Sequence, residues 1–249
     1  MKNVFLSAFR TGIITMLTMI CFSACVVVNA PDFNSVTPKG DPENYEFKVG
    51  QYNRITVEGN LEIRYNARPS DTVILAVQPN IRDYFTVEVI DEELVVRTTR
   101  RITLGAGKAP VLTISTPTLN SISLSGAGSF VANDKIITDS LELIIRGAAN
   151  GKAELEVGML YAEISGAGEM ELSGKADTAD LTLSGVGEIK ALSLETRDAT
   201  VNLSGTGSIR VNSSENLHIN ANGTGSVEYK GAARVNRNTG GLVSVRQIN

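Results

Sequence analysis

The sequence predicts an all-β protein whose larger part is a parallel β-solenoid with rungs of about 20 residues. A short motif with two glycines, typified by SGAGS at residues 125–129, recurs at intervals of 18 to 21 residues. Alternating apolar and polar residues flank the copies, which is the pattern of a strand with one buried face. The chain of 249 residues also has 23 glycines and no tryptophan, a composition that suits a β-rich fold with many tight turns.

The first 24 residues carry the features of a bacterial export signal. Lys2 and Arg10 are basic, and a short apolar stretch follows them up to residue 24. This stretch is too short to span a bilayer comfortably as a helix, which needs about 20 apolar residues. We therefore predict a signal peptide over residues 1–24 that is removed from the mature protein.

The end of this signal is similar to a bacterial lipobox. Residues 22–25 read FSAC, and in a lipobox small residues precede a cysteine that is lipidated and becomes the mature N-terminus. Cys21 is a poorer candidate, because the bulky Ile20 would occupy the cleavage pocket. After cleavage no second cysteine would remain for a disulfide. We expect a lipid anchor on Cys25; the alternative is a simple secretory signal in which Cys25 is incidental.

Residues 25–44 are expected to form a flexible tether between the anchor and the folded domain. The segment contains three prolines and shows little hydrophobic periodicity. Val26 rather than an aspartate follows Cys25, which by resemblance to the enteric sorting rule indicates the outer membrane. The prediction is an exported outer-membrane lipoprotein of a Gram-negative bacterium, facing either the periplasm or the outside.

Residues 45–118 have a β pattern but lack the repeat. Alternation predicts strands at 54–57, 61–66, 72–78, 86–90 and 94–98. A turn is expected at 91–93, and one helical turn within 79–85. We expect this region to begin the solenoid or to cap it, because an uncovered first rung would expose an unpaired strand edge.

Residues 119–249 contain the repeats, which we expect to be the corners of the solenoid. Each rung is predicted to consist of a strand, a Gly-x-Gly corner, a second strand and a loose polar return such as 196–198. Glycine suits the corner because it adopts positive φ without a Cβ clash and lets stacked backbones approach closely. The predicted corner glycines are Gly126, Gly128, Gly147, Gly166, Gly168, Gly185, Gly187, Gly205, Gly207, Gly223 and Gly225.

One copy of the motif departs from the pattern. Residues 146–150 read RGAAN, with Ala149 in the place of the second glycine, and we expect an irregular corner there. The residue before the corner is more regular, because a serine recurs in four copies. Stacked serine hydroxyls are expected to hydrogen-bond to one another and to the turn backbone. These serines are Ser125, Ser165, Ser184 and Ser204.

The glycine motifs do not indicate a nucleotide site. No copy extends to GxGxxG between a strand and a helix. Residues 104–109 (LGAGKA) imitate part of a phosphate-binding loop, but they lack the first glycine at the right spacing and the Ser or Thr after Lys108 that would hold Mg²⁺. The net charge of −4 gives no basic face for nucleic acid. We expect neither a cofactor nor a nucleic-acid partner.

The whole pattern resembles the bacterial family described as "Putative auto-transporter adhesin, head GIN domain". The resemblance rests on YNRITV at 52–57, on TVEV at 86–89 with LVV at 94–96, and on the serial SGxG copies up to GTGSVEYKG at 223–231. It extends over about residues 46–240. The resemblance implies a right-handed β-helix-like fold in secreted or lipid-anchored proteins, and it brings no catalytic motif.

Four glutamates are the candidates for a ligand or cation face. Glu169 and Glu188 follow the corner at the same position of adjacent rungs, so they are expected to stack about 4.8 Å apart. Glu163 and Glu171 lie on the same rung as Glu169. The simpler interpretation is a solvated polar face, since outward strand positions are commonly charged. The alternative is a carbohydrate-active β-helix enzyme, a polysaccharide lyase or hydrolase, that uses these carboxylates.

No metal site is predicted from the rest of the sequence. His218 is the only histidine, which excludes a multi-histidine site, and no cysteine besides a lipidated Cys25 would be left to substitute. Nothing places a serine and an aspartate beside His218. The prediction is a non-catalytic scaffold or adhesin-like module that binds an envelope protein or glycan through its β faces. Self-association through exposed strand edges stays open.

Overall fold

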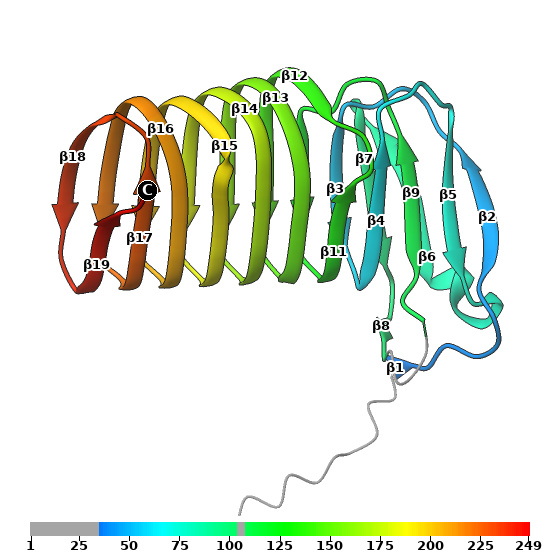
Figure 1. Cartoon of the computed structure of the whole chain (residues 1–249). Helices are drawn as coiled ribbons and strands as arrows, with labels where there is room; N and C mark the ends of the chain where they lie inside the picture. The colour runs from blue at the N-terminus through cyan, green and yellow to red at the C-terminus, as the bar shows by residue number, and fades with distance from the viewer. Residues whose placement is uncertain (1–34, 104–107) are drawn as a thin grey trace, which may run out of the picture. The chain divides into compact units, whose positions relative to one another are not determined.

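The computed structural model describes residues 35–103 and 108–249. Parallel strands stack into a solenoid of about seven turns with rungs of roughly 19 residues (Figure 1). Within the described ranges the one helical element is a 3-10 helix, η1 (Pro79–Tyr84). The all-β class and the solenoid architecture predicted from the sequence are confirmed. The predicted signal peptide, Cys25 and the tether up to residue 34 lie outside the described residues.

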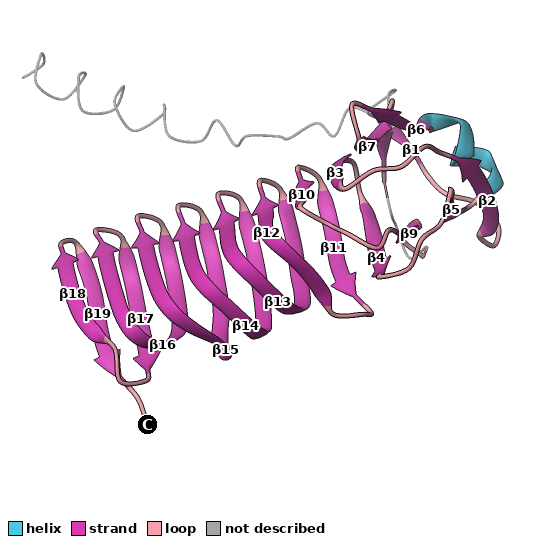
Figure 2. Ribbon diagram, turned by 90° about the horizontal axis from the view of Figure 1, so that it is seen from above, coloured by secondary structure: helices cyan, strands magenta, loops and turns pink. Residues whose placement is uncertain are grey.

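The regular body of the solenoid extends from Ser121 to Gln247. Paired residues of neighbouring strands are 17 to 21 positions apart, as between Thr196 and Ser213 or between Ile122 and Leu143. Seen from above, each rung turns back at a narrow corner before the next begins (Figure 2). The strands are β10 (Ser121–Leu124), β11 (Ala127–Ala132), β12 (Ile136–Ile145), β13 (Ala148–Ile164), β14 (Ala167–Leu183), β15 (Val186–Leu203), β16 (Thr206–Ala221), β17 (Thr224–Lys230), β18 (Arg234–Thr239) and β19 (Leu242–Gln247).

Inward-facing side chains form columns that run through the rungs. One column consists of Leu143, Ala162, Leu181, Val201 and Ile219, which are paired in register from β12 to β16. All five are buried, as the alternating pattern of the sequence predicts. Fully burying one such leucine or isoleucine contributes about 1.5–3 kcal/mol. The columns therefore hold each rung to the next.

The Gly-x-Gly motifs form the sharp corner of each rung and stack directly on one another. The amide of Ala167 donates to the carbonyl of Gly147 at 2.9 Å, and the amide of Val186 donates to that of Gly166 at 2.9 Å. A Cβ added to Gly185 would lie only 1.9 Å from the carbonyl oxygen of Gly166. The close approach of neighbouring rungs accounts for the glycine at this position.

Two more glycine corners lie at the ends of the series. Gly59 forms the corner of an earlier rung, because a Cβ on Gly126 would lie 1.7 Å from the carbonyl oxygen of Gly59. Gly241 forms the last corner, with a φ of +62°, and it stacks on Gly223. Neither glycine belongs to an SGxG motif. Gly59 also precedes Gly126, the corner that stacks on it, by far more than the period of about 20 residues.

The corner at Ala149 is regular in register but differs from the other corners in its backbone angle. Ala149 pairs in register with Gly128 on one side and with Gly168 on the other, and the amide of Ala148 donates to the carbonyl of Gly126 at 2.9 Å. Ala149 has no positive φ and its methyl group is buried, whereas the second glycine of the other SGxG and NGxG corners has a φ between +141° and +159°. The backbone turns at this corner without needing a second glycine.

The side chains next to the corners differ from the expectation. Ser125 Oγ donates to the carbonyl of Val57 at 3.3 Å, but the four corner serines, all within the described ranges, form no hydrogen bond with one another. Ser123, on β10 before the corner, is only 8% exposed. It is covered by Arg146, whose Nη1 donates to Ser123 Oγ at 2.7 Å.

The prediction of a loose polar return between rungs is wrong. Strands β13 to β16 continue through this bend without interruption. Thr196 is buried there, and its Oγ1 donates to the carbonyl of Asn212 at 2.7 Å, while Ser213 Oγ donates to the carbonyl of Arg197 at 3.0 Å. These polar residues suggest a loop in the sequence, but they bind the backbone of the adjacent rung. Register shifts beside Thr196 accommodate the irregular spacing of β15.

The N-terminal region supplies both a rung and a cap. Its rung consists of β3 (Arg54–Glu58) and β4 (Leu61–Asn66), which pair with β10 and β11 on one side and with β7 (Glu93–Thr98) and β9 (Val111–Ser115) on the other. The antiparallel strands β2 (Glu43–Lys48), β5 (Thr72–Val77) and β6 (Phe85–Ile90) then close this end. The predicted strands of this region agree with β3 to β7 within one residue at each end.

Two strands involve residues of the expected tether. Residues 35–36 form β1 (Ser35–Val36), which pairs with β8 (Arg101–Ile102), and residues 43–44 begin β2. The opposite end of the solenoid has no comparable cover within the described ranges, because β18 pairs only with β16 and β19 only with β17. Among residues 35–103 and 108–249, no helix is long and apolar enough to cross a membrane.

Candidate functional site

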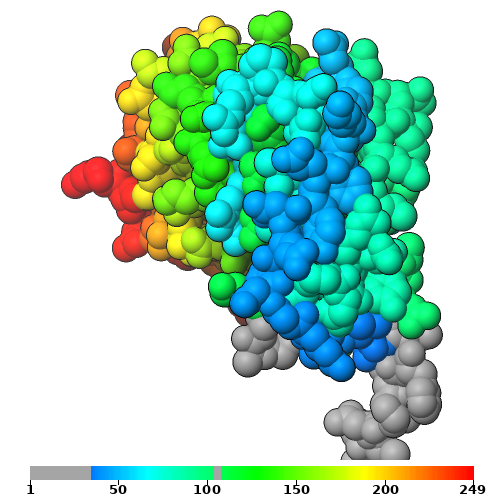
Figure 3. Space-filling view, turned by 90° about the vertical axis from the view of Figure 1, so that its right-hand side faces the viewer, coloured from blue at the N-terminus to red at the C-terminus, as the bar shows by residue number. Residues whose placement is uncertain are grey.

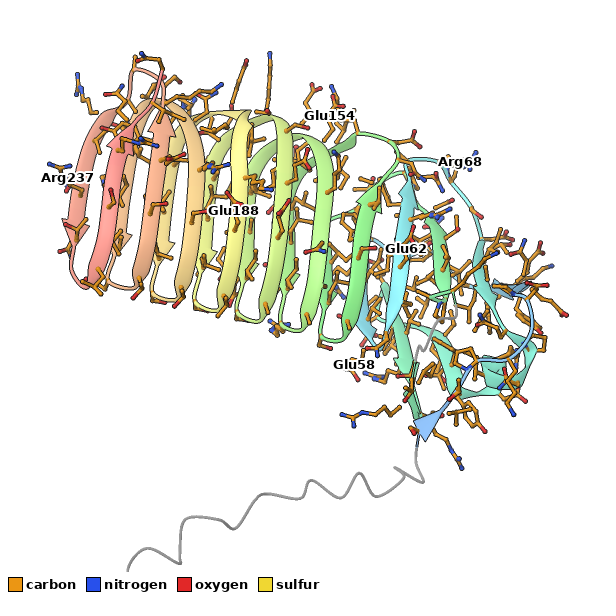
Figure 4. The ribbon with its side chains drawn as sticks, turned by 60° about the horizontal axis from the view of Figure 1, so that its bottom comes forward. Glu58, Glu62, Arg68, Glu154, Glu188 and Arg237 are labelled. Atoms are coloured by element: carbon orange, nitrogen blue, oxygen red, sulfur yellow. The ribbon has the colours of Figure 1, made fainter. Side chains whose placement is uncertain are left out.

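The strands that follow the corners carry charged residues on their outer face. One row, paired in register from β13 to β19, consists of Lys152, Glu171, Lys190, Arg210, Glu228 and Arg246. Glu169 and Glu188 are paired neighbours in a second row beside it. We call these eight residues the ion-pair ladder. Glu188 lies near the middle of the outer face in Figure 4.

Lysine and arginine side chains join the glutamates of the ladder across the rungs. Lys190 Nζ lies 2.7 Å from Glu169 Oε1 and 3.7 Å from Glu188 Oε2. Arg210 connects the next two acids, with Nη1 3.2 Å from Glu188 Oε1 and Nε 3.2 Å from Glu228 Oε2. Each of these cations therefore neutralises two carboxylates on different rungs.

The ends of the ladder are paired in the same way. Lys152 Nζ lies 2.9 Å from Glu171 Oε1, and the guanidinium of Arg246 contacts the carboxylate of Glu228. Exposed ion pairs contribute only about 0–1 kcal/mol each, so the ladder is a modest source of stability. Its stronger effect is to cancel charge along a flat face.

Hydrogen bonds to opposite charges shift the pKa of two ladder residues. The hydrogen bond to Glu169 raises the pKa of the Lys190 ammonium. The hydrogen bond from Arg246, helped by the charge of Arg210, lowers the pKa of the Glu228 carboxyl. Both shifts favour the charged form, so Lys190 and Glu228 stay ionised near neutral pH.

The four predicted glutamates do not converge on one point. Glu163 lies before the corner, on β13, where it pairs in register with Ile144 and Thr182 and accepts a hydrogen bond from the Tyr161 hydroxyl at 2.9 Å. Glu169, Glu171 and Glu188 lie after the corner and contact cations. In the part of the chain that the structure describes, no group of three His, Cys, Asp or Glu side chains could hold a metal ion.

The sequence indicated the stacked glutamates but not their partners. Lys190 and Arg210 occupy outward positions after the corner, so their place on this face could be read from the alternation. Which carboxylate each contacts depends on rotamers and on the exact register of three strands. His218 is exposed on β16 between Thr200 and Asn236 in register.

Glu228 should make stability depend on pH. Because its pKa is lower in the folded state, its contribution is present above the unfolded value of about 4.3 and is lost as the pH falls through the folded-state pKa. We therefore expect Glu228→Gln to lower the melting temperature at pH 7 and to have little effect near pH 2. Thermal unfolding monitored by circular dichroism between these pH values measures the difference. Glu46→Gln, at an exposed position of β2 that forms no ion pair within the described ranges, is the control; an equal deficit of Glu228→Gln at both pH values would contradict the linkage.

Family comparison agrees with the sequence resemblance. The family model described as "Putative auto-transporter adhesin, head GIN domain" matches residues 51–233, which is more than half of the chain. A search of curated proteins finds no match.

Solved structures share the architecture. A "putative adhesin" from Bacteroides fragilis is 26% identical, with a TM-score of 0.79 over 86% of this chain and 100% of that one. A "putative lipid binding protein" from Parabacteroides distasonis is 22% identical, with a TM-score of 0.70 over 86% of this chain and 100% of its own. A "putative adhesin" from Parabacteroides merdae is 20% identical, with a TM-score of 0.60 over 87% and 100%. The last two comparisons concern the fold alone.

Proposed function

The chain belongs to the head GIN domain family of auto-transporter-adhesin-like proteins, and from this we infer that it is a non-catalytic, adhesin-like module of the bacterial cell envelope. In this proposal a lipid on Cys25 holds the protein to the outer membrane, and the solenoid presents its faces to a protein or glycan. The Bacteroides fragilis structure described as a "putative adhesin" supports the same role.

The observation that carries the proposal is the ion-pair ladder. A glycosidase needs two carboxylates placed across a scissile bond, one of them protonated or free to act as a base or nucleophile. Here Glu169 and Glu188 share Lys190, and Glu188 also contacts Arg210. Carboxylates neutralised in this way suit a charge-balanced contact face better than acid–base chemistry. The face is also long and regular, as binding surfaces of solenoid proteins are.

Replacing Cys25 by serine tests both the anchor and the adhesive role. We expect Cys25→Ser to move the protein from the membrane fraction to the soluble fraction, because a serine cannot carry the thioether-linked lipid. Cells that express it should lose the adhesion that the wild-type protein confers on host-cell or glycan-coated surfaces. Fractionation and adhesion counts measure the two effects, and Cys21→Ser is the matched control that should behave like wild type.

Two results would count against the proposal. One is wild-type protein that confers no adhesion above a strain lacking it. The other is cleavage of an acidic polysaccharide, with or without Ca²⁺, that disappears in Glu169→Gln or Glu188→Gln, because that outcome would assign the glutamates to catalysis.

A further inference from the structure

A cleft of about 730 Å³ lies at the capped end, away from the ion-pair ladder. Four connections between strands line it: residues 49–53 before β3, residues 69–71 before β5, Glu92 in the β6–β7 hairpin, and residues 116–118 after β9. Figure 3 views this end of the protein, which the N-terminal segments cover. Its volume is within the range of about 300–1,000 Å³ that is usual for small-ligand sites.

Hydrogen bonds between these connections fix the shape of the cleft. The Tyr52 hydroxyl donates to the carbonyl of Ser115 at 3.2 Å, and Thr116 Oγ1 donates to the carbonyl of Tyr52 at 2.9 Å. Burial raises the pKa of Tyr52 to about 12, so this hydroxyl keeps its proton. The amide of Val49 donates to the carbonyl of Asp71 at 2.8 Å. The site is held in place before a ligand arrives, which reduces the entropy lost on binding.

The carboxylates of the cleft differ from those of the ladder. Asp71 and Glu92 both line the cleft, and neither forms an ion pair with any described residue, whereas the ladder carboxylates are all paired. No lysine or arginine lines the cleft. Glu92 is held at a φ of +61°, and the Asn53 amide donates to its Oε2 at 3.4 Å. Asp71 Oδ1 accepts from the Thr72 hydroxyl at 3.0 Å, so each carboxylate keeps a second oxygen for a ligand that carries hydrogen-bond donors.

We propose that this cleft binds a saccharide without acidic groups, either neutral or amine-bearing; this rests on the proposed adhesin-like function. The amides of Gln51 and Asn53, the hydroxyl of Ser70 and the carboxylates of Asp71 and Glu92 are groups that pair with sugar hydroxyls. Uncompensated carboxylates repel uronic acids and sulfated sugars. Tyr52 is buried and has no exposed ring for stacking, so hydrogen bonds carry the recognition.

Gly50 is a position in the lining of the cleft where bulk can be added without disturbing the fold. It lines the cleft, its φ is not in the positive region, and a Cβ added there would meet no atom within 4 Å. A leucine at this position would therefore extend into free space. The exposed Asn44 of β2 does not line the cleft, so Asn44→Leu is the matched control for added apolar bulk.

The test is binding of the intact protein to an array of neutral, amine-bearing, uronic and sulfated oligosaccharides, followed by calorimetric titration of the sugars that bind. We expect neutral or amine-bearing sugars to bind and acidic ones to fail. Asp71→Asn and Glu92→Gln should each weaken binding about tenfold, as expected for a hydrogen bond to a charged group. Gly50→Leu should abolish binding, while Asn44→Leu and Glu46→Gln, at exposed positions of β2 outside both the cleft and the ladder, should leave it unchanged.

Preference for acidic sugars, capture of peptides alone, or equal binding by all three cleft variants would overturn the cleft proposal. Circular dichroism of each variant shows that it is folded. Adhesion separates this proposal from the one before it: if wild-type cells adhere and the cleft variants adhere equally well, the cleft site fails and the adhesin-like function stands. If wild-type cells do not adhere, the adhesin-like function fails whatever the array shows.

Discussion

Gly207→Ala should lower the free energy of unfolding by at least about 3 kcal/mol, among the larger effects expected of a single substitution. A Cβ at this corner would lie 1.8 Å from the carbonyl oxygen of Gly187 and 2.9 Å from its carbonyl carbon. Those atoms belong to the backbone of the preceding rung and cannot rotate away. The φ of +147° is also one that residues with a side chain rarely adopt. Urea denaturation followed by circular dichroism measures the loss.

Gly151→Ala is the matched control for this prediction. Gly151 lies on β13, its φ is not in the positive region, and its added Cβ would meet Met170 Cγ at 3.6 Å and Ile145 Cδ1 at 3.7 Å, which are ordinary contacts. We expect a change within about 0.5 kcal/mol, or slight stabilisation through the unfolded state. Equal effects of the two alanines would show that stacking does not require the corner glycine.

Arg237→Ile should cause the protein to associate through its open end. Arg237 lies on the last rung (Figure 4), at the register position that the buried Ile219 occupies in the rung before it. A second molecule stacked there would bury an unpaired guanidinium, which costs several kcal/mol. Inward-pointing charges are a known protection of exposed sheet edges. With isoleucine in its place, we expect self-association to tighten at least about a hundredfold, equivalent to about 2.7 kcal/mol.

Sedimentation velocity over a range of concentrations measures this association. Arg234→Ile removes the same charge from the same strand, but Arg234 pairs in register with the exposed Asn216 rather than with a core residue. We expect this control to remain at the wild-type oligomeric state. If the two variants associate equally, net charge rather than the inward position of Arg237 protects the edge.

Local sequence patterns predict the repeating part of the fold well, because the residues that define each rung lie within about 20 consecutive positions. Alternation located the inward columns, and the glycines located the corners. The return bends look like loops in the sequence because Thr196 and Ser213 are polar. In the structure their hydroxyls donate hydrogen bonds to backbone carbonyls of the adjacent rung. Periodicity describes one strand at a time, whereas such bonds depend on the strand beside it.

The order of the rungs could not be read from periodicity. Ile55 pairs with Ile122, 67 positions later, since the whole cap is inserted between two adjacent rungs. For the same reason Gly59 was missed as a corner. The cleft at the capped end was missed too, because its residues come from four separate connections and share no motif. The stacking of Glu169 on Glu188 could be predicted from the sequence. The contact of Lys190 with both carboxylates could not, because it depends on the side-chain conformations in the folded protein.

The inserted cap also sets the order in which the rungs can assemble as the chain folds from its N-terminus. Strands β3 and β4 emerge early, yet their neighbours β9, β10 and β11 extend to Ala132. The rung has a complete partner on one side only when β9 ends at Ser115, and on the other side only at Ala132, so its strand edges stay open to wrong pairing until then. Rungs β12 to β17 instead find each partner about one turn along the chain. Contact order therefore predicts fast, local propagation toward the C-terminus, while closing the N-terminal end is the slow, long-range step at which a chaperone would matter most.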